Sequence, residues 1–147
     1  MFDGASRRRE CGCGAIIYLD LGIHFHFWWE GGQGTNNKTK IMALWGVMLV
    51  TKWLSIEKIT VFDDRKVIID WVNDFTKFTP SILENWMRSI VIMTINFQEV
   101  QLQHIYREQN WRADVLSKRG ISKVTSNTLF TKFTQGKLVN EGLVSFS

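Results

Sequence analysis

The segment "EVQLQHIYREQNWRADVLSKRG" (Glu99–Gly120) decides the fold that this sequence predicts. Its first part alternates in the manner of a β-strand and places on one face Val100, Leu102, His104 and Tyr106. Asn110 can then cap a helix that ends at Gly120, and Asp114 lies in the first turns of that helix. A strand that passes directly into a capped helix is typical of folds in which helices cover the faces of a sheet.

The residues before this segment extend the pattern. Residues 15–21 and 23–29 are rich in β-branched and aromatic residues and are expected to form antiparallel strands. Thr35 or Asn36 can cap a helix whose core-facing stripe is Ile41, Leu44, Trp45, Met48 and Leu49. Strand and helix then alternate, with a strand over 58–63, a helical stripe over 67–75 and a helix start at Thr79–Pro80. The sequence therefore predicts an α/β fold with a mixed sheet, antiparallel first and parallel later.

The length and composition are those of one globular domain. The chain has 147 residues, 45% of them hydrophobic and 22% charged, and a net charge of +4. We expect residues 1–120 to form the domain and residues 121–147 to form a tail, in which two strand-like runs around Gln135–Gly136 indicate a β-hairpin. The apolar run from Ala15 to Trp29 is too short and too polar to span a bilayer, so no membrane association is expected.

The two cysteines and a pair of histidines are candidates for special sites. Cys11 and Cys13 are too close for an unstrained disulfide and too few for a metal site, so free thiols in a reducing compartment, cytoplasm or nucleus, are expected. His24 and His26 would share one face of a strand, which makes a metal site conceivable. The sequence offers no matching third ligand, so a metal site there is not favoured.

Three aspartates occupy positions where strands and helices begin or end. Asp3 lies in a short strand, Asp64 follows the strand over 58–63, and Asp114 lies in the last helix. Each alone is typical of a surface or capping carboxylate. Together they suggest a Mg²⁺ site, because Mg²⁺ prefers carboxylate oxygens drawn from several elements, and two such ions can promote phosphodiester cleavage.

At this point the sequence resembles the type 1 ribonuclease H domain, in the version found in plant retroelements. The resemblance rests on "FDGAS", "GTNN" before a helix, "VFDDRKVIIDW" and "HIYREQNWRADVLSK", and it runs from Phe2 to about Gly120. It implies an RNase H-like mixed five-stranded sheet with helices. It also implies Mg²⁺-dependent hydrolysis of the RNA strand of RNA–DNA hybrids, with Mn²⁺ as a possible substitute.

The resemblance assigns roles to individual residues. Asp3, Asp64 and Asp114 match three of the family's four metal-binding acids, and His104 matches a histidine thought to aid product release or proton movement. Polar residues that contact the hybrid, or that lie near the metal, are matched by Asn36, Asn37 and Asn110. The implied partner is an RNA–DNA hybrid or a similar A-like duplex. A monomer without a small-molecule cofactor is expected.

One position departs from the family pattern in a way that bears on activity. The family's fourth acid is a glutamate where this chain has Lys40, in "TNNKTK". An ammonium there opposes cation binding and has no lone pair to offer while it is protonated. Asp63 precedes the matching Asp64, and strand alternation is expected to turn it to the other face, so it is not expected to replace the missing acid.

Other departures concern the first strand. Only Met1 and Phe2 precede Asp3, so this strand is expected to be truncated, and the following loop reads Arg7-Arg8-Arg9-Glu10. Three hypotheses remain open: an active nuclease, a non-catalytic nucleic-acid-binding remnant in which Lys40 and neighbouring basic residues contact phosphates, and a decayed retroelement without function. Lys40 favours impaired hydrolysis with weakened metal binding.

Overall fold

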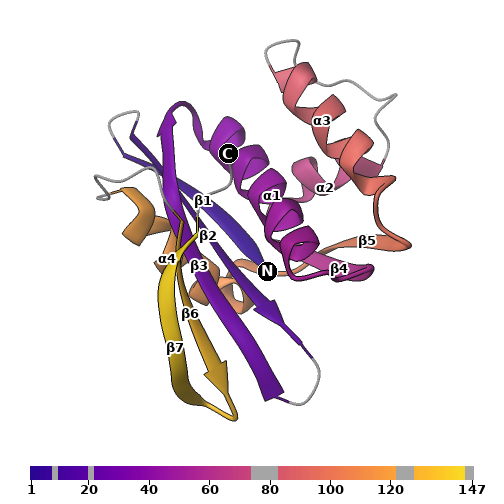
Figure 1. Ribbon diagram of the computed structural model, residues 1–147. Coiled ribbons are helices and arrows are strands. Elements are labelled where there is room, and N and C mark those ends of the chain that lie inside the picture. The colour runs from indigo at the N-terminus through magenta and orange to yellow at the C-terminus, as the bar shows by residue number, and fades with distance from the viewer. Residues whose placement is uncertain (8–9, 20–21, 74–82, 122–127, 145–147) are drawn as a thin grey trace.

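A computed structural model describes residues 1–7, 10–19, 22–73, 83–121 and 128–144 of the chain (Figure 1). Its strands are β1 (Phe2–Arg7), β2 (Glu10–Tyr18), β3 (Ile23–Gln33), β4 (Lys58–Asp63), β5 (Glu99–His104), β6 (Thr128–Thr134) and β7 (Lys137–Val144). Its α-helices are α1 (Asn36–Trp53), α2 (Lys66–Asn73), α3 (Glu84–Thr94) and α4 (Trp111–Ile121), with a short 3₁₀ helix at Arg107–Gln109. The predicted helix start at Thr79–Pro80 lies outside the described residues.

The strands form a five-stranded antiparallel sheet and a separate parallel pair. The five-stranded sheet has the order β1-β2-β3-β6-β7, and β4 pairs with β5 in parallel, with Lys58 opposite Glu99. The predicted α/β class is confirmed, and so is the change from antiparallel to parallel pairing. The assignment of strands differs in one respect: the hairpin of β6 and β7 supplies the last two places of the five-stranded sheet, while β4 and β5 pair only with each other.

Helices α1 and α4 pack on opposite faces of the sheet, as the alternation along β2 requires. The Cys13 Sγ lies 3.7 Å from the carbonyl oxygen of Thr39 on α1. On the other face, a Cβ added to Gly14 would lie 2.4 Å from the backbone nitrogen of Ser117 on α4. Glycine at this position is what allows the α4 backbone to approach the sheet so closely. Both cysteines are buried, and the Cys11 Sγ accepts a hydrogen bond from the Thr39 hydroxyl.

The first strand is short on the side that precedes Asp3. β1 pairs with β2 from Phe2 opposite Ala15 to Arg7 opposite Glu10, so the residues of β2 after Ile16 extend beyond it. A cavity of about 510 Å³ lies there, with Ile17 of β2 and Val61 of β4 in its wall. β4 contacts β1 beside this cavity, but the two strands belong to separate sheets.

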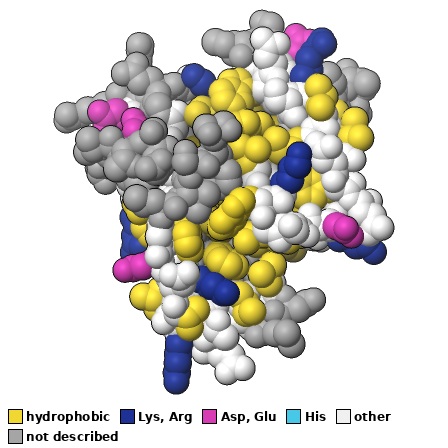
Figure 2. Space-filling model, in the orientation of Figure 1, with side chains coloured by type: hydrophobic (Ala, Val, Ile, Leu, Met, Phe, Trp, Pro, Cys, Tyr) yellow, Lys and Arg dark blue, Asp and Glu magenta, His cyan; other side chains and the backbone are white. Residues whose placement is uncertain are grey.

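The C-terminal hairpin turns at Gln135 and Gly136, which both adopt positive φ angles, 50° and 79°. This is the combination that tight hairpin turns require, and Gly136 meets it without strain. On the face drawn in Figure 2, the Lys and Arg side chains are scattered around a central group of hydrophobic side chains. Within the described residues, no helix is both long enough and apolar enough to cross a membrane.

Candidate active site

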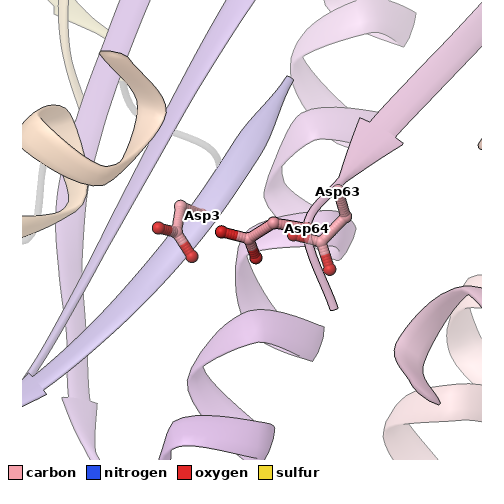
Figure 3. A group of neighbouring side chains, drawn as sticks. All are labelled: Asp3, Asp63 and Asp64. Atoms are coloured by element: carbon pink, nitrogen blue, oxygen red, sulfur yellow. The ribbon is translucent and has the colours of Figure 1, made fainter. Parts of the chain in front are cut away.

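The ammonium group of Lys40 lies among three aspartates. Its Nζ is 2.8 Å from Asp3 Oδ1, 3.2 Å from Asp63 Oδ1 and 2.5 Å from Asp64 Oδ1. The Lys40 side chain is only 8% exposed. Figure 3 shows the three carboxylates gathered between β1 and the end of β4, and their ligand atoms lie within 4.8 Å of one another. Lys40 is therefore the centre of a buried ion cluster, and its ammonium is directed at carboxylates rather than at solvent.

The local sequence explains how Lys40 reaches this position. The side chain of Thr35 caps α1 by accepting from the Lys38 backbone N–H, which fixes where the helix begins. Gly4 then lets β1 approach that first turn, because a Cβ at Gly4 would lie 2.6 Å from the carbonyl carbon of Thr39. Lys40, one residue further along α1, is thereby held beside Asp3, one residue before Gly4.

The expectation for Asp63 was wrong. Asp63 was expected to turn away from the other acids, yet its Oδ1 contacts Lys40 and the residue is fully buried. β4 ends at Asp63 and Asp64 lies in a bend, so strict alternation does not extend across this pair. The chain thus brings three acids to the cluster from β1 and the end of β4, with Asp63 as the residue that the sequence analysis missed.

Burial shapes the ionisation of this cluster. Burial raises the pKa of Asp63 to about 6, although the nearby Lys40 ammonium acts in the opposite direction. Burial also raises the pKa of Asp3, again partly offset by Lys40. For Lys40 itself, burial opposes the charged form, but attraction to Asp63 and Asp3 outweighs it and raises the pKa above its usual value. The lysine therefore remains an ammonium at neutral pH.

We expect Asp63 to make folding stability fall as pH rises from about 4 to about 6. Folded Asp63 retains its proton up to a pKa of about 6, whereas the unfolded chain releases it near 3.8, so the unfolded state binds fewer protons in this window. The effect is at most about 3 kcal/mol. Denaturant unfolding at several pH values should show this loss in the unmodified protein relative to Asp63→Asn. Equal pH profiles for the two proteins would contradict it.

Asp114 and His104 lie at the edge of the cluster. Asp114 lines the same groove as Asp3 and Asp64, but its carboxylate pairs with Lys118, 2.9 Å away, rather than with Lys40. The His104 Nε2 lies 3.1 Å from the backbone carbonyl oxygen of Asp64. Both residues are thus near the cluster, and neither belongs to the group of three acids that could hold a cation.

Asn110 connects two elements of the site. Its buried side-chain Nδ2 donates to the backbone carbonyl oxygen of Phe2, at 3.0 Å, next to Asp3. Its backbone carbonyl accepts from the Asp114 N–H at the start of α4. Asn110 therefore fixes the distance between β1 and α4, which carry Asp3 and Asp114. This contact gives the residue a positioning role. Its Oδ1 is buried and has no hydrogen-bond partner among the described residues, so Asn110 does not cap α4 with its side chain as predicted.

The groove beside the cluster has a volume of about 310 Å³ and is lined by both signs of charge. Its residues are Asp3, Gly4, Ala5, Ser6, Asn36, Lys40, Asp64, Arg65, Arg107, Asp114 and Lys118. Asn36 faces the groove, whereas Asn37 accepts a hydrogen bond from Arg65. Among the polar residues that match the family pattern, Asn36 thus lines the groove. Asn37 instead orients the Arg65 side chain, which also lines the groove.

The cluster as it stands does not fit a divalent cation. The carboxylate oxygens of Asp3, Asp63 and Asp64 have the separation that a metal ion requires, but the Lys40 Nζ lies between them at hydrogen-bonding distances. A divalent ion at the same place would meet a like charge within its coordination shell. The Lys40 ammonium supplies one positive charge at the position that a cation would occupy.

Comparison with known proteins identifies the family. The family model described as reverse transcriptase-like matches residues 1–120. RNase H1 from the archaeon Halobacterium salinarum NRC-1 superposes with a TM-score of 0.75 at 23% identity, covering 81% of this chain and 92% of that one. No curated protein matched the chain.

Two further similar structures are complexes with an RNA/DNA hybrid. LC11-RNase H1, isolated from compost, has a TM-score of 0.68 at 23% identity, with 82% of this chain and 93% of that chain covered. The foamy viral protease-reverse transcriptase has a TM-score of 0.62 at 15% identity, with 84% and 20% covered. At these identities the likeness concerns the fold. With the family model matching most of its length, the chain belongs to the reverse transcriptase-like family and is an RNase H-like domain.

Proposed function

We propose that this domain binds RNA–DNA hybrids along the groove beside the acid cluster and that Lys40 suppresses hydrolysis of the RNA strand. The observation that carries the proposal is the position of the Lys40 ammonium, within 3.2 Å of an oxygen of each of three aspartates. Hydrolysis in the family that the sequence resembles depends on metal ions held by such acids. A lysine that occupies their centre keeps the fold and removes the place for the ion.

The groove supports the binding half of the proposal. Arg65 and Arg107 line it, and neither forms an ion pair with a carboxylate of the described residues. Phosphate contacts need positive charge and hydrogen-bond donors rather than a metal. The partner of this chain is inferred from the hybrids bound by LC11-RNase H1 and by the foamy viral protease-reverse transcriptase.

The contacts of Lys40 change one part of the binding hypothesis. A lysine already held by Asp3, Asp63 and Asp64, and only 8% exposed, is not available to a phosphate. Asp114 lines the groove as well, and its ion pair with Lys118 reduces the repulsion between its carboxylate and a phosphate. The groove therefore recognises a nucleic-acid backbone through Arg65, Arg107 and Asn36, while Lys40 pairs with the three aspartates.

We expect the purified protein to bind a hybrid duplex but to cleave it little, if at all, when Mg²⁺ is present. Binding measured by fluorescence anisotropy should weaken steeply with salt, and Arg65→Ala or Arg107→Ala should each lower the slope of log K against log salt by about 1. Arg88→Ala, which removes an exposed ion pair with Glu84 on α3, is the matched control and should leave the slope unchanged. Robust cleavage by the unmodified protein would overturn the proposed suppression, and absence of binding at low salt would overturn the proposed partner.

A further inference from the structure

Aromatic side chains form a continuous row on the α4 face of the sheet, away from the acid cluster. Tyr18 of β2 lies directly opposite His24 of β3, which lies opposite Phe133 of β6. The His24 and Phe133 rings are stacked, with centroids 4.8 Å apart and planes 5° apart. Tyr18 lies 5.6 Å from His24, and His26 lies 4.7 Å from Phe133. We call these four residues the aromatic row.

An arginine of α4 borders the aromatic row. Arg112 donates to the Tyr18 hydroxyl at 3.4 Å, and its guanidinium lies 5.3 Å from the centre of the Trp111 ring. Tyr18 is 52% exposed and Trp111 is 57% exposed, so both rings present a face to solvent. Arg112 therefore lies between the aromatic row and Trp111, a fifth aromatic side chain at the start of α4.

The histidines contribute uncharged rings to the row. Burial, together with the smaller effects of the neighbouring His24, Arg112 and Arg119, lowers the pKa of His26 to about 4. Burial and Arg112 also lower the pKa of His24. At neutral pH both imidazoles are therefore neutral. Among the described residues they belong to no group of potential metal ligands, so the structure gives no support to a metal site at this pair.

We propose that the aromatic row, together with Arg112 and Trp111, binds single-stranded nucleic acid. Tyr18 and Trp111 are exposed, and His24, His26 and Phe133 are partly exposed. Aromatic rings in line offer surfaces on which successive unpaired bases can stack, and an adjacent arginine can contact the phosphates. None of these residues lines the groove of the acid cluster, so the site is separate from the one proposed for the hybrid. The proposal goes beyond the proposed function and does not depend on it.

Charge favours this partner over a second copy of the chain. Arg112 stands at the row, and the chain carries a net charge of +4, which attracts a polyanion and repels an identical molecule. Glu141 of β7 is exposed and lies opposite Thr131, on the strand next to the row. It would repel a phosphate there, so Glu141→Gln is expected to strengthen binding severalfold.

The test measures binding of fluorescent oligo-dT and oligo-rU of about 15 nucleotides by anisotropy. Tyr18→Ala and Phe133→Ala should each lower affinity about tenfold, because each removes a stacking surface. Arg112→Gln should lower the salt slope by about 0.7, the value for one phosphate contact on a single strand. Trp53→Ala changes an aromatic residue that contacts Phe130 on the other face, and it should leave affinity unchanged.

Several results would overturn the proposal. If Tyr18→Ala binds both oligonucleotides like the unmodified protein, the row is not the site; Tyr18 is half exposed, so this variant is informative even if Phe133→Ala fails to fold. If gel filtration shows a dimer that Tyr18→Ala dissociates, and no oligonucleotide binds, the row is a protein interface instead. Binding of a blunt hybrid duplex is measured in parallel. Changes to the aromatic row should not affect binding of this duplex, so failure of the row to bind single strands can be distinguished from failure of the proposed function.

Discussion

Replacing Lys40 with glutamate is expected to raise cleavage of the RNA strand of a hybrid by about 100-fold or more in the presence of Mg²⁺. The change removes an ammonium that lies 2.5–3.2 Å from three carboxylate oxygens and adds a fourth carboxylate at the same point on α1. A single pair of charges ~4 Å apart contributes about 4 kcal/mol at an effective dielectric of 20, and a tenfold change in rate needs only about 1.4 kcal/mol. The measurement is cleavage of a labelled hybrid, with and without Mg²⁺, by both proteins.

The control for this experiment is Lys52→Glu. Lys52 lies exposed in the last turn of the same helix, so this variant changes the net charge equally but leaves the cluster intact. It should cleave no better than the unmodified protein. If Lys40→Glu is folded, binds the hybrid and still does not cleave it, then Lys40 is not what suppresses hydrolysis. The outlying position of Asp114, paired with Lys118, would then be the next feature to examine.

Local patterns were sufficient to predict most elements of this fold. The Thr35 cap begins α1, residues 58–63 form β4 as predicted, and Asn110 immediately precedes α4. The pairing of the C-terminal hairpin with β3 could not be predicted in the same way. Gln135–Gly136 specifies the turn locally, but the choice of β3 as its neighbour depends on an open edge more than 90 residues earlier in the chain.

The candidate site was harder to predict, because its decisive features are directions of side chains. Asp63 was excluded by strand alternation, and that rule fails where β4 ends in a bend. Lys40 was recognised as a departure from the family pattern, but its interpretation as a phosphate contact assumed a solvent-facing ammonium. Sequence spacing does not reveal that Gly4 brings β1 and α1 close enough for Lys40 to reach all three acids.

Replacing Lys40 with methionine is expected to lower the free energy of unfolding by about 3–5 kcal/mol without divalent cations. Methionine preserves an unbranched side chain of similar length but leaves the buried Asp3 and Asp63 and the partly buried Asp64 without a counter-charge. Breaking a buried ion pair from one side carries this cost because a charge remains unpaired. Proton uptake by Asp63, whose pKa is already about 6, should relieve part of the loss below pH 6.

The same variant is expected to gain a dependence on divalent cations that the unmodified protein lacks. With the ammonium gone, the three acids retain ligand atoms within 4.8 Å of one another, so Mg²⁺ or Mn²⁺ can take its place. A cation present at 100 times its dissociation constant would restore about 2.7 kcal/mol. Lys66→Met, which removes an exposed ion pair with Asp70, is the control; it should cost less than about 1 kcal/mol and show no response to Mg²⁺. Thermal melts with EDTA or Mg²⁺ decide the matter: if Mg²⁺ stabilises the unmodified protein as much as Lys40→Met, then the ammonium does not occupy the place of a cation.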